Sequence, residues 1–192
     1  MSDQDSITTI YFVRHAESLT SHKDDRTRPL TDDGMKDRKI VLETLKGKKI
    51  DAFLCSPYRR SIETISPTAE FFKMEIKTDE RFRERKSGVD PRDHCAGRWA
   101  DFSYAEKGGE CLASVQKRNI EALTDVLREY RGKNVVIGSH GTALSTIINY
   151  YESSFGYESF MKIVKWLPFV VEMKFDGEKF LEYKILCRVE KS

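Results

Sequence analysis

The sequence predicts an α/β fold in which a mainly parallel sheet, with an antiparallel strand and a C-terminal hairpin, lies between helices on both faces. Short apolar runs of strand length, at 7–13, 50–55 and 134–138, alternate with segments whose apolar residues recur at helical spacing. Near the C-terminus, two alternating segments flank the dipeptide Asp176-Gly177, which is typical of a hairpin turn. These two patterns together favour a three-layer arrangement.

The first strand, residues 7–13, is followed by a polar loop that extends to Pro29. Loops of this length in compact domains often border a functional site. Thr31 is the predicted N-cap of the next helix, because two aspartates follow it in the first turn, where the helix dipole favours them. We expect Gly47 to end this helix, and Met35, Leu42 and Leu45 to lie on one side of it.

The second apolar strand is followed by a segment with apolar residues at helical spacing, namely Ile62, Ile65, Ala69 and Phe72. Pro67 interrupts that pattern, so we expect a kink or a restart there. Residues 80–109 are the least regular part of the chain. Three aromatic residues in that segment either line a substrate pocket or cover the core, namely Trp99, Phe102 and Tyr104.

The second half of the chain has the strongest helical periodicity. Between residues 110 and 131 one stripe contains Leu112, Val115, Asn119, Ala122, Leu123, Val126 and Tyr130. A buried strand follows at 134–138, and a further amphipathic helix begins near Ala143. Residues 169–175 and 180–189 then form the predicted hairpin.

Composition and charge limit the classes of function. No repeat, linker or low-complexity tract divides the 192 residues, so we expect a single domain spanning 1–192. Basic and acidic side chains number 33 and 31, and a net charge of +2 gives no electrostatic case for a nucleic acid or a membrane as partner. The sequence leaves the oligomeric state open.

The N-terminal residues are acidic and polar, unlike a secretion signal, and no apolar run approaches the roughly 20 residues that span a bilayer. We therefore expect a cytoplasmic protein. The four cysteines are scattered without a Cys-x-x-Cys pair, so we expect free thiols. They are Cys55, Cys95, Cys111 and Cys187.

Polar residues follow all three predicted apolar strands at the points where the strands end. Arg14-His15 follows the first, Arg59-Arg60 stands shortly after the second, and Ser139-His140-Gly141 follows the third, at the start of a helix. Ligands bind at the carboxyl ends of parallel strands, and guanidinium groups and helix N-termini both favour anions. The sequence therefore predicts an anion-binding crevice with two histidines and at least two arginines.

The same segments resemble the signature motifs of the histidine phosphatase superfamily, the family of cofactor-dependent phosphoglycerate mutases and related phosphatases. The resemblance extends in order from about residue 10 to about residue 145, and implies a phosphoglycerate mutase-like fold. Its motifs are Arg14-His15-Ala16-Glu17-Ser18, Ser56-Pro57-Tyr58-Arg59-Arg60-Ser61-Ile62-Glu63-Thr64, Phe82-Arg83-Glu84-Arg85-Lys86-Ser87-Gly88, Gly109-Glu110-Cys111-Leu112 and Ser139-His140-Gly141.

The resemblance implies a role for each matching residue. His15 falls on the nucleophile that becomes a phosphohistidine, and Glu84 on the acid that protonates the leaving oxygen. The remaining matches bind the phosphoryl group: Arg14, Arg60, His140 and the Gly141 backbone N–H. No metal or other cofactor is implied.

Some positions depart from the family pattern. Ala16 replaces a usual glycine, and Ser61 and Glu63 replace a common alanine and glutamine. Ser21 stands where many members have an asparagine that helps to bind phosphate, which puts one auxiliary contact in doubt. Arg28 is a further candidate substrate contact in the basic loop.

The expected function is hydrolysis of a phosphomonoester, with a small phosphorylated metabolite as substrate. The alternatives are a phosphoglycerate mutase, a phosphohistidine protein phosphatase and a non-catalytic phospholigand-binding module. The second alternative is suggested by the run Arg28-Pro29-Leu30-Thr31, which is similar to a segment of the smaller phosphohistidine protein phosphatases. The stretch 85–109 is shorter than the insertion of the mutases, which favours a phosphatase. Candidates for specificity are Lys23, Arg26, Arg28, Arg92, Arg98 and Trp99.

Overall fold

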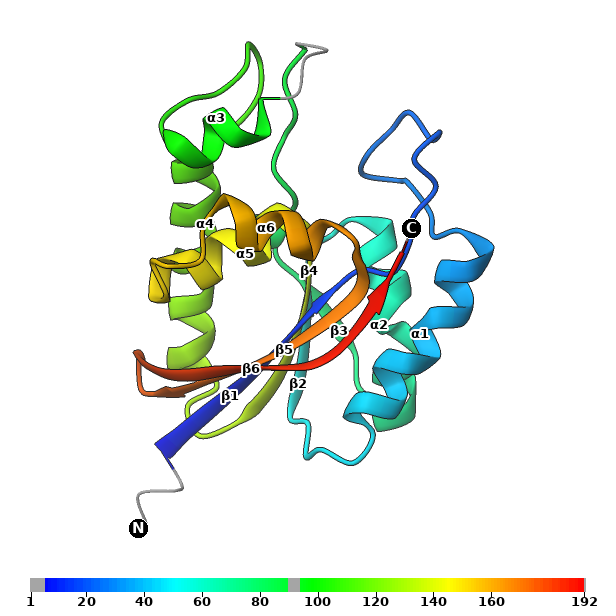
Figure 1. The fold of residues 1–192 in the computed structure, drawn as a ribbon. Helices are drawn as coiled ribbons and strands as arrows, with labels where there is room; N and C mark the ends of the chain where they lie inside the picture. The colour runs from blue at the N-terminus through cyan, green and yellow to red at the C-terminus, as the bar shows by residue number, and fades with distance from the viewer. Residues whose placement is uncertain (1–5, 90–93, 192) are drawn as a thin grey trace.

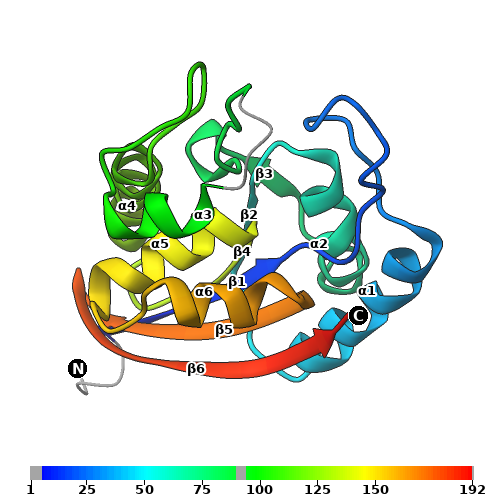
Figure 2. The same cartoon turned by 45° about the horizontal axis from the view of Figure 1, so that its top comes forward.

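Six strands form one sheet in the computed structural model, which describes residues 6–89 and 94–191. Their order across the sheet is β3-β2-β4-β1-β5-β6 (Figure 2). The strands are β1 (Ile7–Arg14), β2 (Ala52–Cys55), β3 (Ile76–Thr78), β4 (Asn134–Ser139), β5 (Trp166–Asp176) and β6 (Lys179–Glu190).

The first four strands run parallel, with β4 between β1 and β2. Strand β5 pairs antiparallel with β1, and β6 returns antiparallel to β5 after the turn at Gly177, whose φ is +58°. The mainly parallel sheet with a C-terminal hairpin is confirmed. In register, Arg14 lies beside Ser139, and Cys55 lies beside Gly138, so three strands end at one edge.

Helices lie on both sides of the sheet, as expected (Figures 1 and 2). Helices α1 and α2 cover one face, and the other four lie over the opposite face. Their bounds are α1 (Asp32–Leu45), α2 (Arg59–Phe72), α3 (Cys95–Ala100), α4 (Leu112–Glu129), α5 (Gly141–Tyr151) and α6 (Tyr157–Val164).

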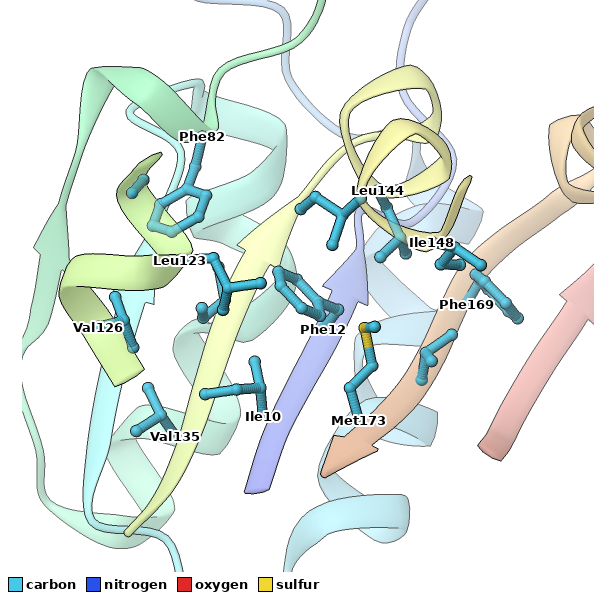
Figure 3. Packing of buried hydrophobic residues seen from close by; sticks show 14 of the residues in the cluster. Ile10, Phe12, Phe82, Leu123, Val126, Val135, Leu144, Ile148, Phe169 and Met173 are labelled. Atoms are coloured by element: carbon cyan, nitrogen blue, oxygen red, sulfur yellow. The ribbon is translucent and has the colours of Figure 1, made fainter. Parts of the chain in front are cut away.

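Each face of the sheet has its own hydrophobic core, because side chains alternate along a strand. In β1, Ile10 and Phe12 point to α4 and α5, whereas Tyr11 and Val13 point to α1 and α2. Figure 3 shows the first of these cores, where Phe82, from the short 3-10 helix η2 (Glu80–Phe82), also enters. Full burial of such side chains stabilises the fold by about 1.5–3 kcal/mol each.

The N-cap at Thr31 is confirmed, since its hydroxyl accepts a hydrogen bond from the Gly34 N–H at 3.0 Å. The apolar side of α1 expected from the sequence is only partly buried. Met35 is 40% exposed, and the helix instead buries Val41 together with Leu45 against the sheet.

Of the two outcomes expected at Pro67, the restart does not occur, because α2 continues through this residue. A proline lacks the N–H that would bind the carbonyl one turn earlier, which here belongs to Glu63. Arg38 of α1 donates to that carbonyl at 3.2 Å instead, so the broken bond is replaced from the neighbouring helix.

Residues 80–109 are irregular, as expected, with only η2 and the short α3 as helices in the part that the structure describes. Trp99 covers the core: its ring lies 5.3 Å from that of Phe160 and 5.5 Å from that of Phe102. Strand β3 and helix α6 have no counterpart among the expected elements. No disulfide bond joins any of the four cysteines, all of which lie among the described residues. None of the described helices has the length and apolar character needed to cross a membrane.

Candidate active site

The predicted residues lie after the ends of three parallel strands, at one edge of the sheet. His15 follows β1 directly, Ser56 follows β2, and His140 lies between β4 and α5. The backbone N–H of His15 bonds to the Ser139 carbonyl at 3.2 Å, and that of Ser56 to the Gly138 carbonyl at 2.9 Å. The sheet register therefore holds these groups close together.

His15 is 6% exposed, and its Nδ1 lies 2.7 Å from the carbonyl oxygen of Ala16. Because a carbonyl only accepts hydrogen bonds, Nδ1 carries the proton and Nε2 has the free lone pair. Burial, followed by the charges of Arg60 and Arg14, holds the pKa of His15 well below its usual value. The ring is therefore neutral at pH 7, with a nucleophilic nitrogen.

His140 is fully buried, and its ring centroid lies 5.3 Å from that of His15. Its Nε2 lies 2.7 Å from the hydroxyl oxygen of Ser56, whereas its Nδ1 has no hydrogen-bond partner in the part of the chain that the structure describes. Burial and then the nearby Arg60 charge keep the pKa of His140 well below its usual value. The second imidazole is therefore neutral as well.

Arg14 lies across the N-terminus of α5. A Cβ on Gly141 would lie 3.1 Å from the guanidinium carbon of Arg14, so the absence of a side chain there permits the close approach. The guanidinium donates to the carbonyls of Ile163 and Trp166. Burial lowers the pKa of Arg14 to about 10, which still leaves it charged at pH 7.

Arg60 has a side chain that is only 1% exposed. It donates to the backbone carbonyl of Asp25 at 2.5 Å, and lies 3.1 Å from the Asp25 carboxylate, which also pairs with Arg28 at 2.8 Å. The guanidinium packs over the ring of Tyr58, with its carbon 5.1 Å from the ring centroid. Loop residue Asp25 thus joins two of the predicted substrate-binding arginines.

Glu84 is held at the start of α5. Its carboxylate accepts hydrogen bonds from the backbone N–H groups of Thr142 at 3.0 Å, Ala143 at 3.2 Å and Arg85 at 2.8 Å. These contacts use the unpaired N–H groups and the positive end of the helix dipole.

Arg118 on α4 supports the segment that carries Glu84. It donates to the carbonyls of Arg81, Arg83 and Glu84, and its other bonds go to the carboxylate of Glu110. Burial raises the pKa of Glu110, but hydrogen bonds from Arg118 and Arg83 outweigh it and lower the value to about 2. The carboxylate is therefore ionised and keeps Arg118 in place.

A cleft of about 520 Å³ opens at this edge of the sheet, and five of the predicted site residues line it: Arg14, His15, Arg28, Arg60 and Glu84. His140 and Gly141 are buried and are not among the residues that line it. Ser21 is exposed and does not line the cleft, whereas its neighbour Thr20 does.

Comparison with known proteins agrees with this geometry. The family model of the histidine phosphatase superfamily (branch 1) matches residues 10–180. The chain belongs to this superfamily. Phosphoserine phosphatase 1 of Hydrogenobacter thermophilus is 27% identical over 149 residues, which is 68% of this chain and 70% of that protein.

Solved structures share the fold of this histidine phosphatase. Bacillus stearothermophilus YhfR is 26% identical, with a TM-score of 0.73 over 91% of this chain and 94% of that one. A mycobacterial glucosyl-3-phosphoglycerate phosphatase is 15% identical, with a TM-score of 0.75 over 93% and 97% of the two chains. The phosphoglycerate mutase-like fold is thereby confirmed.

Several specificity candidates of this histidine phosphatase lie away from the cleft. Lys23 and Arg26 do not line it, and Arg26 pairs with Glu80. Arg98 pairs with Glu106. Arg92 lies outside the described residues.

The cleft has two basic residues that the sequence reasoning missed, Lys165 and Lys191. Lys165 follows α6, a helix that was not predicted, so no pattern marked it as the end of an element. Lys191 follows the last strand and carries no motif. Only the sheet, by pairing β5 with β1, brings them to the site.

Proposed function

We propose that this chain is a metal-independent phosphatase that hydrolyses small phosphorylated metabolites through a phosphohistidine at His15. The observation that carries the proposal is the state of His15: it is neutral, with its Nδ1 hydrogen bonded to a carbonyl, in a cleft that two arginines also line. An imidazole in this state is a nucleophile at pH 7.

In the first step, His15 Nε2 attacks the phosphorus atom and the ester P–O bond breaks. The leaving oxygen takes a proton from the carboxyl group of Glu84, which lines the same cleft. Arg14 and Arg60 stabilise the negative charge on the equatorial oxygens, which is the main requirement of phosphoryl transfer. Its products are the free alcohol and a phosphohistidine.

In the second step, water attacks the phosphohistidine and Glu84 takes a proton from it. The P–N bond breaks, and neutral His15 and inorganic phosphate are released. Buried His140 lies against His15 and contributes a second imidazole to the phosphate pocket. The backbone N–H of Gly141, at the start of α5, adds the positive end of a helix dipole.

Two observations support a phosphatase of small molecules over the alternatives. The relative at 27% identity is named a phosphoserine phosphatase, and a phosphorylated amino acid is a small substrate. None of the described residues between 85 and 109 lines the cleft, so none of them encloses it as a mutase needs in order to retain its intermediate.

The test is hydrolysis of p-nitrophenyl phosphate by the wild type and by His15→Ala, with EDTA present. We expect activity in the wild type and a loss of at least about 10³-fold in the variant, because the nucleophile is removed. Equal activity in both proteins would refute the role of His15. Interconversion of phosphoglycerates without net release of phosphate would instead identify a mutase, and binding of phosphate without turnover a binding module.

A direct measurement of the intermediate complements the assay. Rapid acid-free quenching after mixing with a ³²P-labelled phosphomonoester should trap label on the wild-type protein, and the label should be stable in base and labile in acid. The variant Glu84→Gln should accumulate more of the labelled protein if Glu84 also activates water. Absence of label in both proteins would contradict a covalent mechanism.

A further inference from the structure

Lys165 and Lys191, hereafter the lysine pair, lie side by side at the cleft. The backbone N–H of Lys191 donates to the carbonyl oxygen of Lys165 at 2.8 Å. Both residues line the same cleft as His15 and Glu84. Figure 2 shows how this arises: the C-terminal end of β6 reaches the turn between α6 and β5.

The catalytic arginine fixes the position of this turn. Arg14 donates to the carbonyls of Ile163 and Trp166, which lie on either side of Lys165 in the sequence. The lysine pair is therefore anchored next to the guanidinium that is proposed to bind the phosphoryl group. It lies beyond the residues to which the proposed mechanism assigns a role.

The charges of the lysine pair differ in how they are compensated. Lys191 forms an ion pair with Asp37 at 2.6 Å. Lys165 is exposed and forms no ion pair with any residue of the ranges 6–89 and 94–191. Glu17, which lines the same cleft, adds a further negative charge near Lys191. Lys165 is therefore the positive charge of the pair that remains without an ion-pair partner among the described residues, and a single charge matches a carboxylate better than a second phosphate dianion.

We propose that the lysine pair binds a carboxylate group carried by the phosphorylated substrate, with Lys165 as its principal contact. The inference rests on the proposed function and names its substrate class: phosphomonoesters of small carboxylic acids. The phosphoryl group contacts His15 and the arginines, and the carboxylate points to the turn after α6.

The test uses two substrates of the same length that differ in one group: 3-phosphoglycerate, which has the carboxylate, and glycerol 3-phosphate, which has a hydroxymethyl group there. The wild type should prefer 3-phosphoglycerate by about tenfold in kcat/KM, the effect of one charged contact. Lys165→Met should remove this preference through KM, and should leave hydrolysis of glycerol 3-phosphate and p-nitrophenyl phosphate unchanged.

Lys162→Met is the matched control, because Lys162 is an exposed lysine of α6, the helix that Lys165 follows, and does not line the cleft. This variant should keep the wild-type preference. A uniform loss on all three substrates in Lys165→Met, or no loss on any, would overturn the inference. A preference for fructose 1,6-bisphosphate over fructose 6-phosphate, without one for 3-phosphoglycerate, would assign the lysine pair to a second phosphate and overturn the carboxylate.

Binding separates this inference from the proposed function. Calorimetry with His15→Ala measures the affinity for both compounds without turnover. A stronger affinity for 3-phosphoglycerate that Lys165→Met abolishes would support the carboxylate site even if the wild type hydrolysed nothing. Equal affinities would overturn it even if hydrolysis through His15 were established.

Discussion

Arg118 on helix α4 donates a hydrogen bond of 3.2 Å to the backbone carbonyl of Glu84. The same guanidinium binds the carbonyls of Arg81 and Arg83, at 2.6 Å and 2.7 Å. Arg118 does not line the cleft, so its effect on catalysis would pass through the position of Glu84. It is a positioning residue in this proposal.

Replacement of this arginine should slow the reaction without weakening substrate binding. We expect Arg118→Met to lower kcat by about tenfold or more with KM within about twofold, because small displacements of a catalytic group are costly. Arg118→Lys should recover part of the loss. The comparison is Arg128→Met, which removes an exposed arginine from the same helix and should leave kcat unchanged. Equal losses in both variants would contradict the positioning role.

The carboxylate of Asp25 forms ion pairs with the arginines that are proposed to bind substrate. It lies 3.1 Å from Arg60 and 2.8 Å from Arg28. A phosphate in the cleft must compete with it, so Asp25→Asn should lower both KM and the inhibition constant of inorganic phosphate, each by about fivefold. Asp24→Asn, a change in the same loop, is the control. A higher KM in Asp25→Asn would mean that the carboxylate orients the arginines instead.

Buried His15 should make stability depend on pH. Its folded pKa is lowered by burial and by Arg60, whereas the unfolded value is about 6.5. The unfolded chain therefore binds a proton first as the pH falls, so the stabilisation is complete above about pH 6.5 and is lost from there through the folded pKa.

Tm measured between pH 8 and pH 5 tests this. The wild-type unfolding free energy should fall by up to about 1.4 kcal/mol per pH unit for each such histidine. His15→Asn should have a shallower slope below pH 6.5, and the two curves should run parallel above pH 7.5. Identical slopes over the whole range would show that His15 titrates alike in both states.

Gly34 should tolerate no side chain. A Cβ there would lie 2.1 Å from the carbonyl oxygen of Glu17, so Gly34→Ala forces the loop after β1 away from α1. The expected loss in unfolding free energy is about 1–3 kcal/mol. Gly47→Ala, at a position where no atom of the described residues lies within 4 Å of the added Cβ, should change the unfolding free energy by less than about 0.5 kcal/mol. Chemical denaturation of the two variants measures both unfolding free energies and so tests this prediction.

Much of the fold could be predicted because its signals are local. The alternation of Ile10 and Phe12 with Tyr11 and Val13 follows from strand periodicity, and the buried stripe of α4 follows from helical periodicity. Burial could not be predicted where it depends on how an element packs against its neighbour. Met35 is as apolar as Val41, but only the direction of α1 on the sheet determines which of them is buried.

The candidate site divides in the same way. His15, Arg14, Arg60 and His140 could be placed from motifs at strand ends, because parallel strands end at one edge. Asp25 and the lysine pair could not. Their role depends on how the loop after β1 folds back and on where β6 ends, which is set by contacts between residues distant in the chain.

The sequence by itself determined the family, the order of most strands and helices along the chain, with β3 and α6 as exceptions, and the residue types at the strand ends. These depend on local spacing and on short motifs. The tertiary structure alone decided which charges meet in the cleft: Asp25 with Arg60, Glu84 with the start of α5, and Lys165 with Lys191. Electrostatic interactions depend on distance in space, and sheet register and helix packing set those distances.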